Sequence, residues 1–367
     1  MRIALFCKVI DNLGDAGVCW RLARQLIQAG ASCTLLINEL STLAQLAPSL
    51  QFQPVQDLDG LCIIHWTNDT QAFAMLEQDA WIGCFACDWH PLLWKALAQQ
   101  ERPPRLYNLE YLGMESWVEG CHGKDSIHPT TGLRQTFWIP GFSPASGGLL
   151  REAGLLDRHE QWRQTPPQLP GLVNWPNADR ILSLFCYAQA PLAGLIQALS
   201  ENTLYSYLLV FPGPGLQAVS RVLNQPLSPH ELIHQGSLSI HCLPLLNHTD
   251  YDLVLGACDL NLVRGEDSLL RAHWAGRPLL WQAYPQDQLA HCDKVTAWLN
   301  LRPISPAFIK LHQRYNQGTA QTEDFLAALA SLDEETHLIR QFRAQLAQQS
   351  DLCYRLLANL QTTVALI

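Results

Sequence analysis

The feature that most constrains the fold is an alternation of short apolar runs and helix-like segments. The first forty residues contain one complete repeat of it. An apolar run at 2–9 is followed by a loop at 10–14, by apolar residues at helical spacing from Val18 to Ala29, and by a second apolar run at 33–37. Such alternation predicts parallel strands joined by helical crossovers. We therefore expect an α/β fold.

The alternation continues to about residue 150 and restarts near residue 180. Residues 158–179 are rich in Gln, Pro, Asn and Trp and show no clear period, which is typical of a linker. We therefore expect two Rossmann-like, doubly wound domains, with ligands bound outside the carboxyl ends of the strands, in the cleft between the halves. The expected parts are 1–155 for the first domain, 156–179 for an irregular linker, 180–350 for the second domain and 351–367 for a C-terminal helix.

Composition agrees with a large globular protein. The chain has 367 residues, of which 48% are apolar and 16% charged, so it has material for two cores. Its net charge of -9 argues against direct binding of nucleic acid. Twelve cysteines spread over a long chain are typical of buried thiols rather than disulfides. Without a signal peptide or a membrane-length apolar run, we expect a cytoplasmic protein with no membrane partner.

Residues 264–268, Arg-Gly-Glu-Asp-Ser, lie between an apolar run and a helix-like segment. A strand that ends in a polar loop and opens a helix presents free N–H groups to an anion. Arg264 adds bidentate contacts to phosphate, and Ser268 donates a hydroxyl. Glu266 would repel phosphate unless it faces a sugar, so the loop favours a nucleotide-linked sugar. A plain helix capped by Asp267 or Ser268 is the alternative.

The loop at 11–17 places two carboxylates, Asp11 and Asp15, at the start of a helix. Its glycines do not form the G-x-G-x-x-G pattern of dinucleotide-binding proteins. A carboxylate at a helix N-terminus is stabilised as the anion, which opposes phosphate binding but suits a general base or a group that orients a cation. The alternative is that Asp15 caps the helix and Asp11 is solvated.

Three further residues follow strands of the second half. Tyr187 lies where a ribose or base edge would be met, and Phe185 lies there or in the core. Gln288 and its neighbours from residue 282 on follow the apolar run at 278–281, where a nucleotide would lie. These positions are consistent with a nucleotide-sugar site, although none of them is diagnostic alone.

Cys84 and Cys87 form a single C-x-x-C, with His90 close by. Zinc needs four ligands, and no second pair with suitable spacing is present. Redox chemistry would place such a motif at a helix start after a thioredoxin-like first unit. We therefore expect packed thiols near a strand end, and no metal site.

Several segments in order carry a resemblance over nearly the whole chain: 10–21, 108–112, 117–123, 140–142, 147–151 and 264–268. Together they resemble the EarP family, the arginine rhamnosyltransferases of elongation factor P. The resemblance implies a GT-B fold whose C-terminal helix returns to the first domain. It also implies an inverting, metal-independent transfer of rhamnose from dTDP-β-L-rhamnose to an arginine of elongation factor P, with no cofactor.

The resemblance also implies roles for single residues. Asp15 matches a catalytic aspartate, Asp11 a second acid near the acceptor, and Glu266 an essential glutamate in the donor loop. The expected donor-binding residues are Phe185, Tyr187, Arg264, Gly265, Asp267, Ser268 and Gln288.

One local departure follows the Phe-Ala-Cys segment, where Asp88 precedes Trp89 and His90, and we expect this loop to tune acceptor contact. Two other readings stay open. One is a GT-B glycosyltransferase with another nucleotide sugar or acceptor. The other is a non-catalytic GT-B-like protein that binds a translation factor. A nicotinamide-dependent oxidoreductase is disfavoured because the glycine fingerprint is missing.

Overall fold

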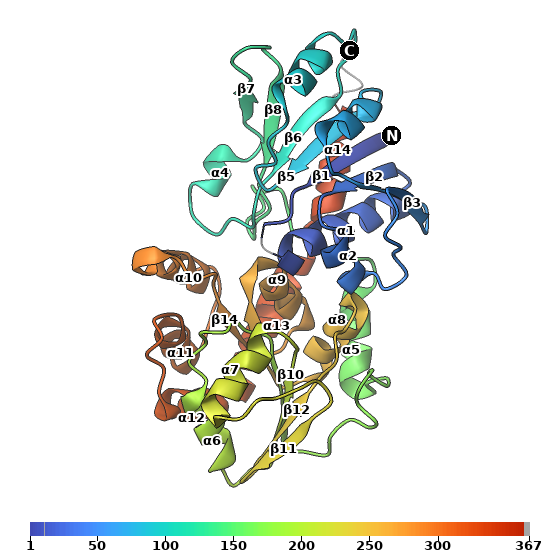
Figure 1. Ribbon diagram of the computed structural model, residues 1–367. Helices are drawn as coiled ribbons and strands as arrows, with labels where there is room; N and C mark the ends of the chain where they lie inside the picture. The colour runs from blue at the N-terminus through green and yellow to red at the C-terminus, as the bar shows by residue number, and fades with distance from the viewer. Residues whose placement is uncertain (11, 363–367) are drawn as a thin grey trace. The chain divides into compact units, whose positions relative to one another are not determined.

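The computed structural model describes residues 1–10 and 12–362. Two compact units make up the chain (Figure 1). Unit 1 contains Met1–Glu152 together with the segment that starts at Gln349, and unit 2 contains Ala153–Gln348. Unit 1 is therefore assembled from two separate stretches of sequence. None of the described helices is both long and apolar enough to cross a membrane.

Unit 1 is built on a sheet in the order β3-β4-β2-β1-β5-β6-β8-β7. Its inner strands are parallel, whereas the edge strands β3 and β7 are antiparallel to their neighbours. Strands β1 and β5 are buried almost throughout, as expected of parallel strands covered on both faces. The strands are β1 (Arg2–Cys7), β2 (Ser32–Ile37), β3 (Val55–Leu58), β4 (Leu61–His65), β5 (Ala80–Cys84), β6 (Arg105–Leu109), β7 (Asp125–Ile127) and β8 (Arg134–Trp138).

A C-terminal helix completes unit 1. Helix α14 (Leu352–Thr362) is drawn in red among the blue and cyan elements of this unit in Figure 1. Arg105 Nη1 donates to the carbonyl of Leu360 at 2.5 Å, and Tyr107 donates its hydroxyl to Asn359 Oδ1 at 2.6 Å. Both donors lie on β6. The other helices are α1 (Asn12–Gln28), α2 (Leu40–Leu46), the 3-10 helix η1 (Asp69–Met75), α3 (Pro91–Ala98) and α4 (Val118–Cys121).

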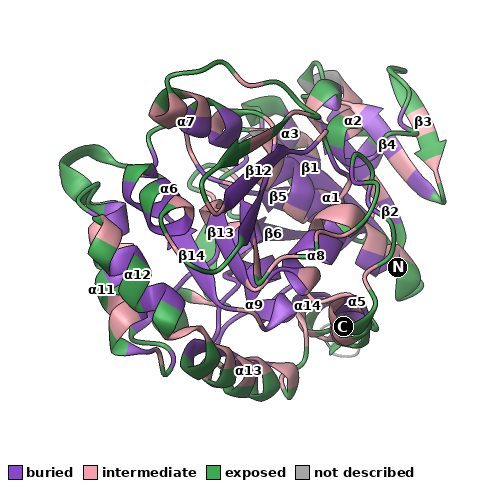
Figure 2. Cartoon of the chain, turned by 90° about the horizontal axis from the view of Figure 1, so that it is seen from below, coloured by how far each residue is buried: buried purple, intermediate pink, exposed green. Residues whose placement is uncertain are grey.

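Unit 2 has a second, smaller sheet in the order β11-β12-β10-β9-β13-β14. Only its edge strand β11 is antiparallel among the described strands. The inner strands are buried, and Figure 2 shows β12 and β13 largely in the colour of buried residues. The strands are β9 (Arg180–Leu184), β10 (Ser206–Val210), β11 (Leu232–Gln235), β12 (Leu238–Cys242), β13 (Leu260–Arg264) and β14 (Leu279–Gln282).

Helices cover this sheet and extend to the end of the unit. They are α5 (Leu155–Gln164), α6 (Ala193–Ser200), α7 (Pro214–Leu223), α8 (His248–Ala257), α9 (Gly265–Ala275), η2 (Asp287–Leu289), α10 (His291–Leu299), α11 (Pro306–Asn316), α12 (Thr322–Ala330) and α13 (Leu332–Ala347). Helices α11 and α12 contribute Phe308, Leu311 and Phe325 to the same apolar core as Leu182 and Leu208 of the sheet.

The structure corrects two predictions. The segment 156–179 is not an irregular linker, because helix α5 occupies its first part and the whole segment belongs to unit 2. Helix α5 packs on α8, and its Trp162 belongs to the same buried apolar cluster as Leu253 and Val254 of α8. The sheets are also mixed rather than purely parallel, because the short edge strands β3, β7 and β11 each form an antiparallel hairpin with the next strand.

Candidate functional site

In unit 2 the candidate site is centred on the junction of β13 and α9. Arg264 ends the strand in an extended conformation and is the residue before the first turn of α9. Gly265 follows with φ +64°, a left-handed conformation that favours glycine. The indole Nε1 of Trp281 donates to the Gly265 carbonyl at 2.7 Å, which ties this turn to β14. The helix therefore starts from a fixed backbone, with its first N–H groups presented as an anion site.

The Arg264 side chain lies against two aromatic rings. Its guanidinium carbon is 4.4 Å from the ring centre of Phe185 and 4.8 Å from that of Tyr187. Its Nη1 also donates to the carbonyl of Cys186 at 3.5 Å. The contacts form because β9 and β13 are parallel neighbours whose carboxyl ends meet. The structure thus brings together Arg264, Phe185 and Tyr187, and the rings attract the cation through their π-faces.

Tyr187 is held by the neighbouring strand. Its backbone N–H donates to Gln282 Oε1 at 2.9 Å, and its ring meets the exposed ring of Tyr284 edge-on at 5.6 Å. The two tyrosines extend the aromatic surface beside Arg264. Gln288 is exposed within η2 and has φ +55°. Its place in a donor site stays a prediction.

The first turn of α9 carries the two carboxylates of the loop. Glu266 forms an ion pair with Lys294 of α10, and the side chains are 24% and 27% exposed, respectively. Asp267 is half-buried, whereas Ser268 is buried. Lys294 had no signal in the sequence, because it lies in a separate helix and belongs to no recognisable motif. Only the side-chain contact between α10 and α9 in the folded chain identifies it.

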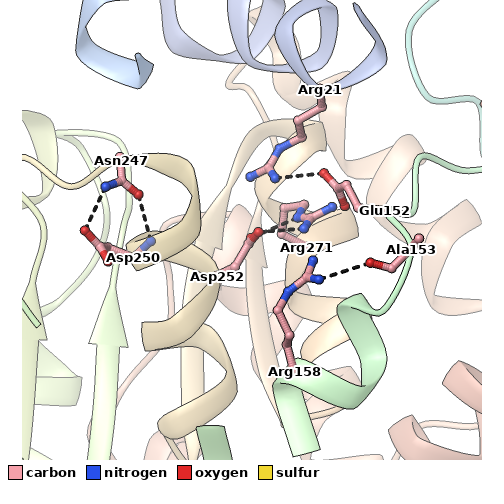
Figure 3. Close-up of polar contacts among 8 residues, drawn as sticks. All are labelled: Arg21, Glu152, Ala153, Arg158, Asn247, Asp250, Asp252 and Arg271. Atoms are coloured by element: carbon pink, nitrogen blue, oxygen red, sulfur yellow. Dashed lines mark hydrogen bonds and ion pairs between the residues drawn. The ribbon is translucent and has the colours of Figure 1, made fainter. Parts of the chain in front are cut away.

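Helix α9 is anchored one turn further on by a buried ion pair. Arg271 Nε and Nη2 donate to the two carboxylate oxygens of Asp252 in α8, at 2.9 and 2.6 Å (Figure 3). The start of α8 is capped by Asn247, whose Oδ1 accepts from the Asp250 N–H at 3.0 Å. Bidentate arginine–carboxylate pairs fix geometry as well as charge. The direction of α9, and with it the loop at 264–268, is therefore set by α8.

A buried histidine lies beside this anchor. His159 of α5 is almost completely buried and meets Trp162 edge-on at 5.2 Å. Burial lowers the pKa of His159 to about 3, an effect that the nearby carboxylate of Asp252 partly opposes. The imidazole is therefore neutral at physiological pH.

In unit 1 the candidate site is the junction of β1 and α1. Asp15 lies in the first turn of α1, is only 1% exposed, and accepts the backbone N–H of Ile10 on Oδ2 at 2.8 Å. The preceding residue, Val9, donates its N–H to Asn38 Oδ1 at 2.8 Å. The Ile10 bond thus closes the loop over its own carboxylate, and the Val9 bond ties the loop to the residue that follows β2. Asp11 lies outside the described residues.

The carboxyl ends of β5 and β6 follow β1 in the sheet of unit 1. Phe85 and Ala86 have φ of +60° and +53°, and such strained residues cluster at functional sites. The Phe85 ring stacks on Tyr111 at 4.5 Å. Glu110 accepts from Asn108 Nδ2 at 2.5 Å, and burial raises the pKa of its carboxyl group. Sequence reasoning did not single out Glu110 for a role.

The thiols near this edge are packed, as predicted. Cys84 and Cys87 are buried and unbridged, and burial raises the pKa of Cys87 above its ordinary range. His90 caps α3, because its Nδ1 accepts the Leu92 N–H at 3.2 Å. Asp88 is exposed, and its carbonyl accepts from Lys8 Nζ at 3.0 Å. Each of the twelve cysteines is a free thiol.

Known proteins are similar to this chain in sequence and in fold. The family model "Elongation-Factor P (EF-P) rhamnosyltransferase EarP" matches residues 3–361. The protein-arginine rhamnosyltransferase of Pseudomonas putida is 38% identical over 303 residues, which is 80% of each chain. That of Pseudomonas aeruginosa is 39% identical over 305 residues, covering 81% of this chain and 80% of the relative.

The fold is shared with a solved structure described as "Structural basis for EarP-mediated arginine glycosylation of translation elongation factor EF-P". The TM-score is 0.65 at 24% identity, over 98% of this chain and 99% of that one. The two α/β units therefore have the GT-B glycosyltransferase fold. With the family model spanning nearly the whole sequence, the chain belongs to the EarP family of elongation factor P rhamnosyltransferases.

Proposed function

We propose that this chain transfers rhamnose from dTDP-β-L-rhamnose to an arginine side chain of elongation factor P, with inversion and without a metal ion. Family membership supports the coarser activity, since the relatives named above are protein-arginine rhamnosyltransferases. The observation that carries the donor chemistry is the position of Arg264 against two aromatic rings at the start of α9.

The donor would bind to unit 2 through its diphosphate. As the bond between sugar and phosphate breaks, negative charge develops on the leaving group. The N-terminus of α9 and the guanidinium of Arg264 are fixed positive groups that favour this charge, the role that a divalent metal serves in other transferases. The rings of Phe185 and Tyr187 hold the guanidinium by their faces. Phosphate can therefore use the in-plane N–H groups of Arg264.

Glu266 has a different task in this proposal. A carboxylate in the first turn of α9 would repel a phosphate placed on the same N–H groups. We assign Glu266 to the rhamnose, where its oxygens accept hydrogen bonds from hydroxyl groups or stabilise positive charge on the sugar ring. Asp267 and Ser268 complete the turn around the diphosphate.

The acceptor is chemically difficult. A guanidinium is protonated in water, and its nitrogen lone pairs are delocalised. Asp15 and Asp11 would grip the guanidinium and orient one nitrogen towards the anomeric carbon. That nitrogen forms the new bond to carbon while the carbon–oxygen bond to dTDP breaks, and Asp15 takes the nitrogen's proton. One displacement of this kind inverts the anomeric carbon.

The deciding experiment is the intact mass of elongation factor P after incubation with this protein and dTDP-L-rhamnose in EDTA. We expect a gain of one deoxyhexose that maps to a single arginine. A gain only when a metal is added would refute metal independence. A donor panel tests the reading with another nucleotide sugar, which predicts modification with that sugar instead. A non-catalytic partner protein would bind elongation factor P and leave its mass unchanged with every donor.

A further inference from the structure

We propose that Lys294 is a positioning residue of the donor site. Its ammonium group holds the Glu266 carboxylate and offsets the repulsion between that carboxylate and the donor's diphosphate. The inference rests on the proposed function of the 264–268 loop as the nucleotide-sugar site. It adds a residue from a different helix, α10, to that site.

A second side-chain contact between α9 and α10 supports the position of the Glu266–Lys294 ion pair. Glu266 belongs to the first turn of α9 and His273 to its last turn. On α10, Lys294 contacts Glu266, and Trp298 one turn later donates its Nε1 to His273 Nε2 at 3.0 Å. Two contacts therefore join the same pair of helices. Their spacing fixes Lys294 beside the start of α9.

Helix α10 is also fixed at its own start. His291 is buried, and its two ring nitrogens bond to the Gln286 N–H at 3.2 Å and to the carbonyl of Asn316 at 3.0 Å. The ring of Trp298 meets Trp281 edge-on at 5.5 Å, and Trp281 in turn bonds to the carbonyl of Gly265. The donor loop and α10 thus share one packed support. Lys294 is not a loosely placed surface lysine.

The charges around the 264–268 loop explain why a lysine beside Glu266 would favour binding of a diphosphate. Arg264 and the N-terminus of α9 attract a diphosphate, but Glu266 and Asp267 lie in the same turn and repel it. Both members of the Glu266–Lys294 pair are mostly buried, so solvent screens them less than an exposed pair. A lysine on the Glu266 carboxylate cancels most of its field at the diphosphate. It also holds the carboxylate in one place, as sugar contacts require.

The test is a double-mutant cycle on nucleotide binding by the full chain, measured by calorimetry with dTDP. Lys294→Met keeps the aliphatic stem and removes the charge, so we expect affinity for dTDP to fall about tenfold. Glu266→Gln removes the repelling charge and should bind dTDP at least as well as the wild type. In the double variant, affinity should return to within about threefold of the wild type, because the Glu266 charge that Lys294 offsets is no longer there.

Two further variants separate positioning from folding. Lys294→Arg keeps the charge and should retain affinity for dTDP. Lys310→Met is the matched control, because Lys310 also pairs with a carboxylate in unit 2, that of Asp324, which Arg314 holds as well. We expect its affinity for dTDP and its rate of rhamnose transfer to be unchanged.

Two results would overturn the inference. Unchanged dTDP affinity in Lys294→Met would show that the ammonium does not offset Glu266. A double variant as weak as Lys294→Met alone would show that Lys294 contacts phosphate directly. If the wild type binds UDP or GDP but not dTDP, the proposed donor is wrong. The same cycle with the nucleotide that binds then still tests Lys294.

Discussion

Two junctions of this molecule have the same backbone plan and opposite chemistry. In unit 1, β1 leads into α1, and in unit 2, β13 leads into α9. Both helices start with N–H groups that attract an anion. Helix α1 supplies its own anion, the buried carboxylate of Asp15. Helix α9 is preceded by Arg264, and its Glu266 is paired with a lysine. In the proposed function, these side chains decide that the first junction binds a cation and the second a phosphate.

The two junctions also differ in how they are held. In the β1–α1 loop, the Ile10 N–H bonds to Asp15 within the same segment, and the Val9 N–H bonds to Asn38, the residue that follows β2. The β13–α9 junction is held from outside, by Trp281 on one side and by the buried Arg271–Asp252 pair on the other. Damage to the first should therefore affect chemistry, whereas damage to the second should affect folding and nucleotide binding.

The largest expected effect is on turnover in Asp15→Asn. Loss of the general base should slow rhamnose transfer by about 10²–10⁴-fold. Affinity for dTDP should not change, because the proposed donor-binding residues belong to unit 2. Single-turnover mass spectrometry and calorimetry measure the two effects. The control is Asp59→Asn, at an exposed aspartate of unit 1 outside both candidate sites, and it should remain active. A fully active Asp15→Asn would end its assignment as the base.

Arg271→Met tests the external support of α9. Removing one partner of a buried ion pair leaves an uncompensated charge, so we expect unit 2 to lose about 3–5 kcal/mol of stability. The double variant Arg271→Met/Asp252→Leu should lose less, because no charge is stranded. Urea unfolding followed by circular dichroism measures both. Equal losses in the single and double variants would argue against this explanation.

Arg264→Ala should change affinity for dTDP, whereas Asp15→Asn should change the rate of rhamnose transfer. It removes the cation from the donor loop, so affinity for dTDP should fall about 30-fold, or about 2 kcal/mol. Arg134→Ala, at an exposed arginine of unit 1, provides the control for loss of a positive charge. If dTDP bound Arg264→Ala as tightly as the wild type, phosphate recognition would have to rest elsewhere.

The last expected effect, at most as large as that of Arg264→Ala, concerns stability in acid. The pKa of His159 is about 3 in the folded chain and about 6.5 when unfolded. The unfolded chain therefore binds the extra proton between these values, and stability falls as pH drops below 6.5. This contribution reaches about 2 kcal/mol at pH 5. Unfolding of wild type and His159→Gln at pH 7 and pH 5 should show the smaller pH effect in the variant. Identical pH dependence would contradict the neutral buried histidine.

The sequence was most informative where signals are local. Asp15 and Arg264 each lie in a strand–loop–helix segment, so their place at a helix start could be predicted from neighbouring residues alone. The position of Tyr187 after a strand could be predicted in the same way, because β9 and β13 are both apolar runs that end in polar residues. Lys294 could not be predicted, since its contact with Glu266 depends on how α10 packs.

Physical reasons also explain why two elements, β7 and α5, were not predicted from the sequence. Strand β7 is an edge strand of its sheet, and all three of its residues are exposed. It therefore has no buried face that would show as an alternation of apolar residues in the sequence. Helix α5 is largely polar, which suggested a linker. Its buried residues Leu155, His159 and Trp162 nevertheless recur at helical spacing, and that signal was available.

The return of α14 to unit 1 has a consequence for synthesis on the ribosome. Unit 1 begins first, yet the helix that bonds to β6 is made only after all of unit 2. At about 5–20 residues per second, the wait is about 10–40 s. During that time, Arg105 and Tyr107 of β6 lack the hydrogen-bond acceptors that α14 later supplies. Nascent unit 1 thus stays incomplete until unit 2 has been made, and we expect a stop codon shortly before α14 to destabilise the domain translated first.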